Sequence, residues 1–139
     1  MFRPAIDPMR LPSVGDEKLD AQHRVLLQLG LEASTELGHT FDRSAHRLLN
    51  NLVEAIEDHF ETEERKLAAV GYPDLDAHRQ LHLEVQEKVA DLLLNASLGN
   101  CSPVEITKLV LNWVEDHVRN ADLPYAEFLE RAHRACETV

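Results

Sequence analysis

Apolar residues recur along most of this chain at intervals of three and four, which places them on one face of an α-helix. Four such stretches follow one another, and a weaker amphipathic pattern comes last. Glycine or proline separates them, as is typical of helix ends. We predict helices over Glu17–Leu37, Arg43–Val70, Pro73 to just before Gly99, Pro103 to about Asp122, and Pro124–Cys136.

Short connections between the helices predict their topology. Neighbouring helices joined by short loops run antiparallel. The start of the fourth helix is the clearest, since Ser102–Glu105 matches a capping box with proline at the first helical position. Gly30 inside the first helix indicates that a neighbouring helix packs closely there. We predict an all-α fold, an antiparallel up-down-up-down four-helix bundle, with residues 1–15 as an N-terminal arm and residues 16–139 as one domain that includes a short C-terminal helix.

Histidine and carboxylate side chains interrupt the apolar faces at one end of this bundle. In this topology the starts of the first and third helices meet the ends of the second and fourth. A buried polar group without a partner is costly, so a converging set indicates a metal site. Nitrogen and oxygen ligands without a thiolate suit iron, manganese or zinc. The seven candidate ligands are His23, His59, Glu63, His78, His82, His117 and Asp122.

The remaining histidines provide an internal comparison. His39 lies in the first interhelical turn and His46 opens the second helix, both at the opposite end of the bundle. His133 lies in the C-terminal tail. We expect all three on the surface.

Several acidic residues lie beside the candidate ligands. At about 100° per residue, Glu61, Glu64 and Asp116 point away from the apolar faces, and we expect them to be solvated. Asp20 precedes His23 by nearly one turn. It could cap the helix or hold an imidazole in place, and we favour the capping role.

Seven ligands exceed what one tetrahedral or octahedral ion can use. Two ions that share bridging carboxylates account for the number, and Glu63 and Asp122 are the candidate bridges. The pattern differs from the ferritin-like di-iron arrangement, which uses a Glu from two helices and Glu-x-x-His from the others. A site rich in neutral histidines favours the ferrous state.

Charge and composition narrow the function classes. The 139 residues carry a formal net charge of −11, which argues against nucleic acid and anionic membranes as partners. No stretch has the roughly 20 apolar residues needed to cross a bilayer, and no signal peptide is evident. For Cys101 and Cys136 we favour free thiols in a reducing cytosol over a disulfide. We expect a cytoplasmic protein.

Several motifs together resemble the hemerythrin family, in particular the bacterial hemerythrins, over residues 14–125. The resemblance rests on Val14-Gly15, Leu19-Asp20-x-Gln22-His23, His59-Phe60-Glu61-Thr62-Glu63-Glu64, Gly71-Tyr72-Pro73, His78-x-x-x-His82 and Trp113-x-x-x-His117-x-x-x-x-Asp122-x-x-Tyr125. Many bacterial members carry a tryptophan in the N-terminal arm, where this chain has Ile6–Arg10.

The resemblance implies a di-iron centre. One iron would be held by His78, His82 and His117, and the other by His23 and His59. Glu63, Asp122 and a solvent-derived oxo or hydroxo oxygen would bridge the two ions.

The resemblance also implies a non-enzymatic protein for oxygen transport, storage or delivery. Dioxygen would bind reversibly, as a hydroperoxide, on the iron with an open coordination position, and an unidentified protein could receive it. Two alternatives stay open: a sensor of dioxygen, nitric oxide or redox state, and an enzyme that reduces peroxide or nitric oxide. From their helix positions, we expect the dioxygen pocket to be lined by Leu26, Ile56, Phe60, Trp113 and Val114.

Overall fold

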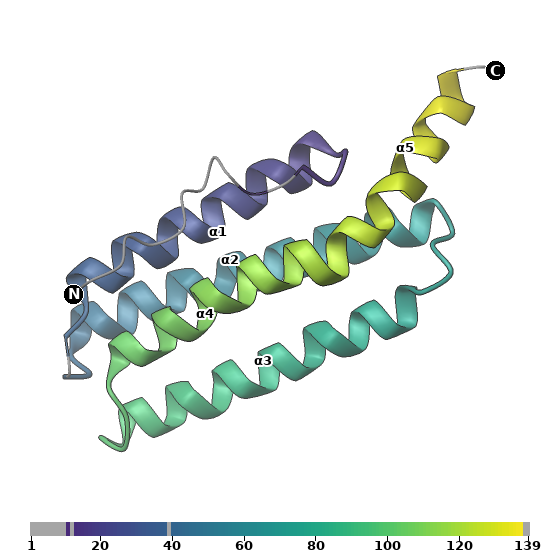
Figure 1. Ribbon diagram of the computed structural model, residues 1–139. Helices are drawn as coiled ribbons and strands as arrows, with labels where there is room; N and C mark the ends of the chain where they lie inside the picture. The colour runs from purple at the N-terminus through teal and green to yellow at the C-terminus, as the bar shows by residue number, and fades with distance from the viewer. Residues whose placement is uncertain (1–10, 12, 39, 138–139) are drawn as a thin grey trace.

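The computed structural model describes residue 11, residues 13–38 and residues 40–137, with only the backbone described at 120, 121, 123 and 133–137. Its helices are α1 (Glu17–Glu36), α2 (Arg43–Ala69), α3 (Leu75–Ser97), α4 (Pro103–His117), a π-helical segment η2 (Val118–Asp122) and α5 (Leu123–Glu137). Figure 1 shows α1 to α4 running antiparallel to their neighbours, with α5 continuing from α4 beyond the bundle. The predicted all-α four-helix bundle is confirmed.

Local residues explain where the helices begin. The Asp16 carboxylate accepts a hydrogen bond from the Leu19 backbone N–H at 3.0 Å, and Asp42 accepts one from Ala45 at 2.8 Å. Both contacts satisfy an N–H group that a helix start leaves without a partner. The third helix begins at Leu75, two residues later than predicted, because Asp74 is its N-cap.

Close packing of α1 against α4 depends on Gly30. A Cβ atom at this buried position would lie only 2.8 Å from Cδ2 of Leu111. A larger residue would therefore force the Leu111 side chain or the helices to shift. The cost of glycine inside a helix, about 1 kcal/mol relative to alanine, is offset by this close approach.

The core runs along the length of the bundle and continues to its metal-ligand end. Leu19, Leu26, Leu52, Phe60 and Leu129 are each 1% exposed or less. By contrast, α3 leaves large apolar side chains exposed, among them Leu83 at 50% and Leu94 at 58%, and its C-cap Leu98 is 65% exposed. Within the described residues, none of the helices combines the length and apolar character needed to cross a membrane.

Most of the predicted N-terminal arm, residues 1–10 and 12, lies outside the described residues. Val14 is fully buried, and its backbone N–H donates to Asp20 Oδ1 at 2.8 Å. The Ser13 hydroxyl donates to the other oxygen of Asp20. Asp20 therefore fastens the chain before α1, which is a structural role as we favoured, but the N-cap of the helix is Asp16 and not Asp20.

Candidate metal centre

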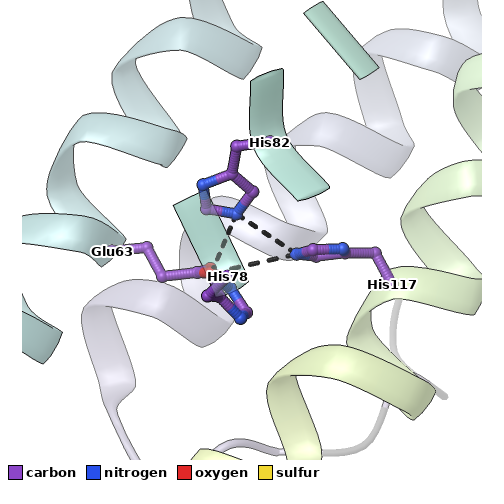
Figure 2. Close-up of side chains that lie close together, drawn as sticks. All are labelled: Glu63, His78, His82 and His117. Atoms are coloured by element: carbon purple, nitrogen blue, oxygen red, sulfur yellow. Dashed lines mark hydrogen bonds and ion pairs between the residues drawn. The ribbon is translucent and has the colours of Figure 1, made fainter. Parts of the chain in front are cut away.

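The seven predicted ligands lie together at one end of the bundle, and each is at most 6% exposed. Their ligand atoms form two groups that share one carboxylate, with the atoms of each group within 4.8 Å of one another. Figure 2 shows the first group, in which Glu63 faces three imidazoles from α3 and α4. The first group is Glu63, His78, His82 and His117, and the second is His23, His59, Glu63 and Asp122.

Glu63 faces both groups, with one oxygen toward each. Its Oε1 contacts Nε2 of His78 and lies 3.2 Å from Nε2 of His82. Its Oε2 lies 2.9 Å from Nε2 of His59 and 3.8 Å from Nε2 of His23. This is the arrangement that a carboxylate bridging two ions requires.

Asp122 divides its oxygens in the same way. Oδ1 lies 3.0 Å from Nε2 of His117 and 3.1 Å from Nε2 of His78, while Oδ2 lies 3.2 Å from Nε2 of His23. Both carboxylates thus connect a three-histidine group (His78, His82, His117) with a two-histidine group (His23, His59).

Several of these buried atoms have no hydrogen-bond partner among the described residues. They include both ring nitrogens of His23, Oε2 of Glu63 and both oxygens of Asp122. In addition, the Nε2 atoms of His82 and His117 face each other at 3.2 Å. Buried polar atoms of this kind are normally paired, and a cation would satisfy them together. The donor set therefore fits bound metal ions.

Electrostatics at the cluster favour positive charge. Burial and the nearby Glu63 carboxylate oppose ionisation of Asp122, but the imidazoles of His117, His23 and His78 prevail and lower its pKa to about 2. Burial likewise disfavours charge on His23, yet Asp122 and Glu63 raise the pKa of that imidazole to about 9. Two anionic carboxylates thus draw protons onto neighbouring histidines, where metal cations would supply the same charge.

The pKa values of His78, His117 and Glu63 shift for the same reasons. The pKa of His78 is also raised to about 9, because Asp122 and Glu63 outweigh its burial, and the pKa of His117 is raised for the same reason. Burial opposes ionisation of Glu63, but four imidazoles lower its pKa well below the usual value. The pKa of His59 is lowered, chiefly by burial.

Two polar side chains outside the cluster bind its imidazoles. Oε2 of Glu64 lies 2.9 Å from Nδ1 of His82, and Oε1 of Gln22 lies 2.9 Å from Nδ1 of His59. Our prediction that Glu64 is solvated was wrong, because α3 packs over that side of α2 and leaves the side chain 27% exposed. Gln22 was not predicted to contact the cluster, although it is a polar residue directly beside the candidate ligand His23.

Aromatic rings cover the three-histidine group. Phe60 stacks on His82 with ring centroids 3.8 Å apart, and Trp113 stacks on His117 at 4.8 Å. The two aromatic rings meet edge to face at 5.2 Å. Phe60 is 1% exposed and Trp113 is half-buried, so together they shield this side of the cluster from water.

The other three predicted pocket residues are also buried. Leu26 and Val114 are each 1% exposed and Ile56 is 3% exposed. Ile56 also lines an apolar pocket of about 80 Å³ between α2 and α3, together with Val53 and Val89. That these residues line a dioxygen pocket stays a prediction.

The residues that we expected on the surface fall into two sets. His46 and Asp116 are exposed, and Glu61 is 75% exposed, as predicted. His39 and the side chain of His133 lie outside the described part of the chain.

Of the two cysteines, Cys101 is a free thiol, as predicted. The side chain of Cys136 lies outside the described part of the chain.

Comparison with known proteins now decides the family. The family model described as "Hemerythrin HHE cation binding domain" matches residues 14–135. The chain belongs to the hemerythrin family. A cation-binding domain is what the cluster of histidines and carboxylates, with its unpartnered buried atoms, indicates independently.

Relatives of this hemerythrin domain come from animals and bacteria. A myohemerythrin of Theromyzon tessulatum is 28% identical over 78% of this chain and 81% of its own length. A hemerythrin subunit of Sipunculus nudus is 30% identical over 81% of this chain and 83% of its own. A bacteriohemerythrin of Stenotrophomonas maltophilia is 24% identical over 83% of this chain and 75% of its own.

A solved structure supports the fold. The crystal structure of a wild-type hemerythrin superposes with a TM-score of 0.75 and covers 84% of this chain and 90% of its own. Its sequence identity to this chain is 24%. The hemerythrin bundle is therefore present here despite extensive sequence difference.

Proposed function

We propose that this hemerythrin domain holds two iron ions and binds dioxygen reversibly, as a carrier, store or delivery protein. The observation that carries the proposal is the division of oxygens at Glu63 and Asp122. Each carboxylate turns one oxygen toward the three-histidine group and the other toward the two-histidine group. A single ion would leave one oxygen of each without a use.

The ligand assignment follows from these two groups. His78, His82 and His117 would hold one ion, and His23 and His59 the other. Glu63 and Asp122 would bridge them, together with a solvent-derived oxygen. His23 and His59 supply one imidazole fewer than the other group, which would leave a coordination position for dioxygen on that ion.

The bound ions would supply the electrons that make dioxygen binding favourable. The protein supplies the surroundings. Its buried imidazoles are neutral ligands, which limit the negative charge of the site and favour the ferrous state. Phe60 and Trp113 pack directly on two of these imidazoles and exclude water from their side of the cluster. Exclusion of water and protons is what distinguishes reversible binding from irreversible oxidation.

Metal content tests the first half of the proposal. Protein reconstituted with ferrous iron, desalted and analysed for metals should hold two irons per chain. Asp122→Asn should lower that number, because the amide cannot bridge as a carboxylate does. One iron per chain at saturation would contradict the di-iron assignment.

Turnover assays test the second half. Binding without catalysis predicts that the reduced protein consumes peroxide or nitric oxide only in amounts comparable to its own concentration. Sustained turnover of either would favour an enzyme instead. A cytoplasmic location and a protein that receives dioxygen stay predictions from the sequence.

A further inference from the structure

Gln22 and Glu64 differ in charge, although both bind the outer nitrogen of a cluster imidazole. Gln22 is hydrogen-bonded to His59 of the two-histidine group, and Glu64 is hydrogen-bonded to His82 of the three-histidine group. In both rings Nε2 faces Glu63, at 2.9 Å for His59 and 3.2 Å for His82. Without metal, Glu63 can draw a proton onto Nε2, so the outer contact decides only whether Nδ1 holds a proton, which leaves Nε2 to the metal once one is bound.

The direction of the hydrogen bonds at Gln22 is set by a chain of contacts that ends on the backbone. The carbonyl of Asp58 can only accept, so the Thr62 hydroxyl donates to it, at 2.8 Å. The Thr62 oxygen then accepts from the amide nitrogen of Gln22 at 3.2 Å. This fixes the amide, with its oxygen toward His59, and the His59 Nδ1 must carry the proton.

Glu64 fixes His82 by a different route. An ionised carboxylate has no proton to donate, so the His82 Nδ1 must donate to it. The other oxygen of Glu64 accepts from Nε of Arg79 at 3.2 Å, which holds the carboxylate in place. Here the outer partner carries a negative charge, whereas the amide of Gln22 is neutral.

We propose that Gln22 and Glu64 are positioning residues, which hold His59 and His82 with Nε2 toward the metals. Because Glu64 is charged and Gln22 is neutral, the two metal positions also differ electronically. A carboxylate partner makes an imidazole a stronger donor and stabilises higher positive charge on the metal. A neutral amide does so less. The two-histidine position is thereby kept closer to the ferrous state; this part of the inference rests on the proposed di-iron function.

Thr62 offers a test that needs no iron. A metal bound at Nε2 would itself dictate the protonation of the ring, so the metal-free protein reports the preference set by the chain. Nitrogen NMR of the wild type should show a proton on Nδ1 of His59, whether or not Glu63 also holds one on Nε2. Thr62→Val frees the Gln22 amide to turn over, and a mixture of the two ring forms should appear. Thr62→Ser keeps the hydroxyl and should retain the wild-type spectrum.

The matched control is Thr35→Val. Thr35 lies on the exposed side of α1, and its hydroxyl also donates to a backbone carbonyl, at 2.8 Å. The same chemical change there should leave the His59 nitrogens untouched. A wild-type His59 without a proton on Nδ1, or a Thr62→Val spectrum identical to wild type, would overturn the role of Gln22.

Charge substitutions in the iron-loaded protein test whether the two metal positions differ electronically. Glu64→Gln removes negative charge behind His82 and should raise the reduction potential of the site. Gln22→Glu adds negative charge behind His59 and should lower it. Substitutions that only disturb the fold have no reason to move the potential in opposite directions. Shifts of the same sign, or none, would overturn the electronic part of the proposal.

Zinc affinity separates this inference from the proposed function. Competition with a chelator should show that Glu64→Ala weakens zinc binding, by about 10–100-fold if it behaves like other partners of metal-bound histidines. If the wild type failed to bind dioxygen, the NMR and zinc results would still decide the roles of Gln22 and Glu64. Unchanged zinc affinity in Glu64→Ala would show that Glu64 does not contribute to metal binding.

Discussion

Asp122 comes five residues after His117, yet its Oδ1 lies 3.0 Å from the His117 Nε2. In a regular α-helix, side chains five residues apart point about 140° away from each other. The two side chains meet because residues Val118–Asp122 form the π-helical segment η2, whose wider turn brings residues five apart onto one face. The second carboxylate of the cluster therefore depends on a local change of helix type.

Changing the length of η2 tests this dependence. Deleting Arg119 leaves Asp122 four residues after His117, the spacing that a regular α-helix places on one face. We expect this variant to keep its metal. Inserting an alanine after Arg119 makes the spacing six residues and should cost the protein at least half of its metal, measured by elemental analysis.

Both changes alter the chain by one residue at an exposed position, so each controls for the other. The ion pair of Arg119 with Glu115 is exposed and contributes little to stability. Equal metal loss in the two variants, with helicity preserved by circular dichroism, would show that helix register does not position Asp122.

The sequence predicted the features that depend on periodicity within each helix. Seven side chains on apolar faces, combined with antiparallel topology, predicted residues that the structure brings together. The π-helical segment η2 was not predicted, although two expected ligands five residues apart cannot share one face of a regular α-helix. The sequence could not predict that Glu64 meets His82. That contact depends on how α2 and α3 are rotated against each other, which is a property of packing.

The two halves of the cluster should respond differently to loss of a histidine. His23→Ala or His59→Ala leaves one imidazole for that ion, and we expect the ion to be lost. Removing one of His78, His82 or His117 leaves two imidazoles, and we expect both ions to stay with an altered absorption spectrum. Metal analysis of all five variants measures the difference.

His46 is the control for these variants. It is exposed on α2, away from the cluster, so His46→Ala should keep its full metal content. Equal metal content across the five cluster variants would contradict the expected difference between the two-histidine and three-histidine groups. Metal loss in His46→Ala would contradict the assignment of the cluster itself.

Val114 lies one turn before His117 and is 1% exposed. Val114→Ala should open space beside the cluster and admit water, which promotes irreversible oxidation of the reduced site. We expect oxidation in air to become several-fold faster, with unchanged iron content and helicity. Oxidation at the wild-type rate in a folded variant would remove Val114 from the pocket and direct attention to Leu26 and Ile56.

Stability in acid should depend on Asp16. Burial opposes its ionisation, but the Leu19 N–H and Lys66, 3.0 Å away, prevail and lower its pKa below 3.8. A lowered carboxyl pKa stabilises the fold above the unfolded value, and this stabilisation is lost as the pH falls through the folded pKa. Asp16→Ala should cost about 1 kcal/mol at neutral pH, and the difference from wild type should shrink in acid.

Urea denaturation across a pH series measures this difference. Asp42 caps α2 in the same manner, but is exposed, and Asp42→Ala provides the matched control for the loss of a cap alone. A cost for Asp16→Ala that grows as the pH falls would contradict the assigned sign.

Optical titration of the iron-loaded protein shows whether dioxygen binds reversibly. Protein reduced anaerobically should develop a new visible absorption band when dioxygen is added. The band should disappear when dioxygen is removed by argon, and it should return over repeated cycles at a stoichiometry of one dioxygen per two irons. A single irreversible conversion to the oxidised spectrum, or no spectral response to dioxygen, would contradict the account.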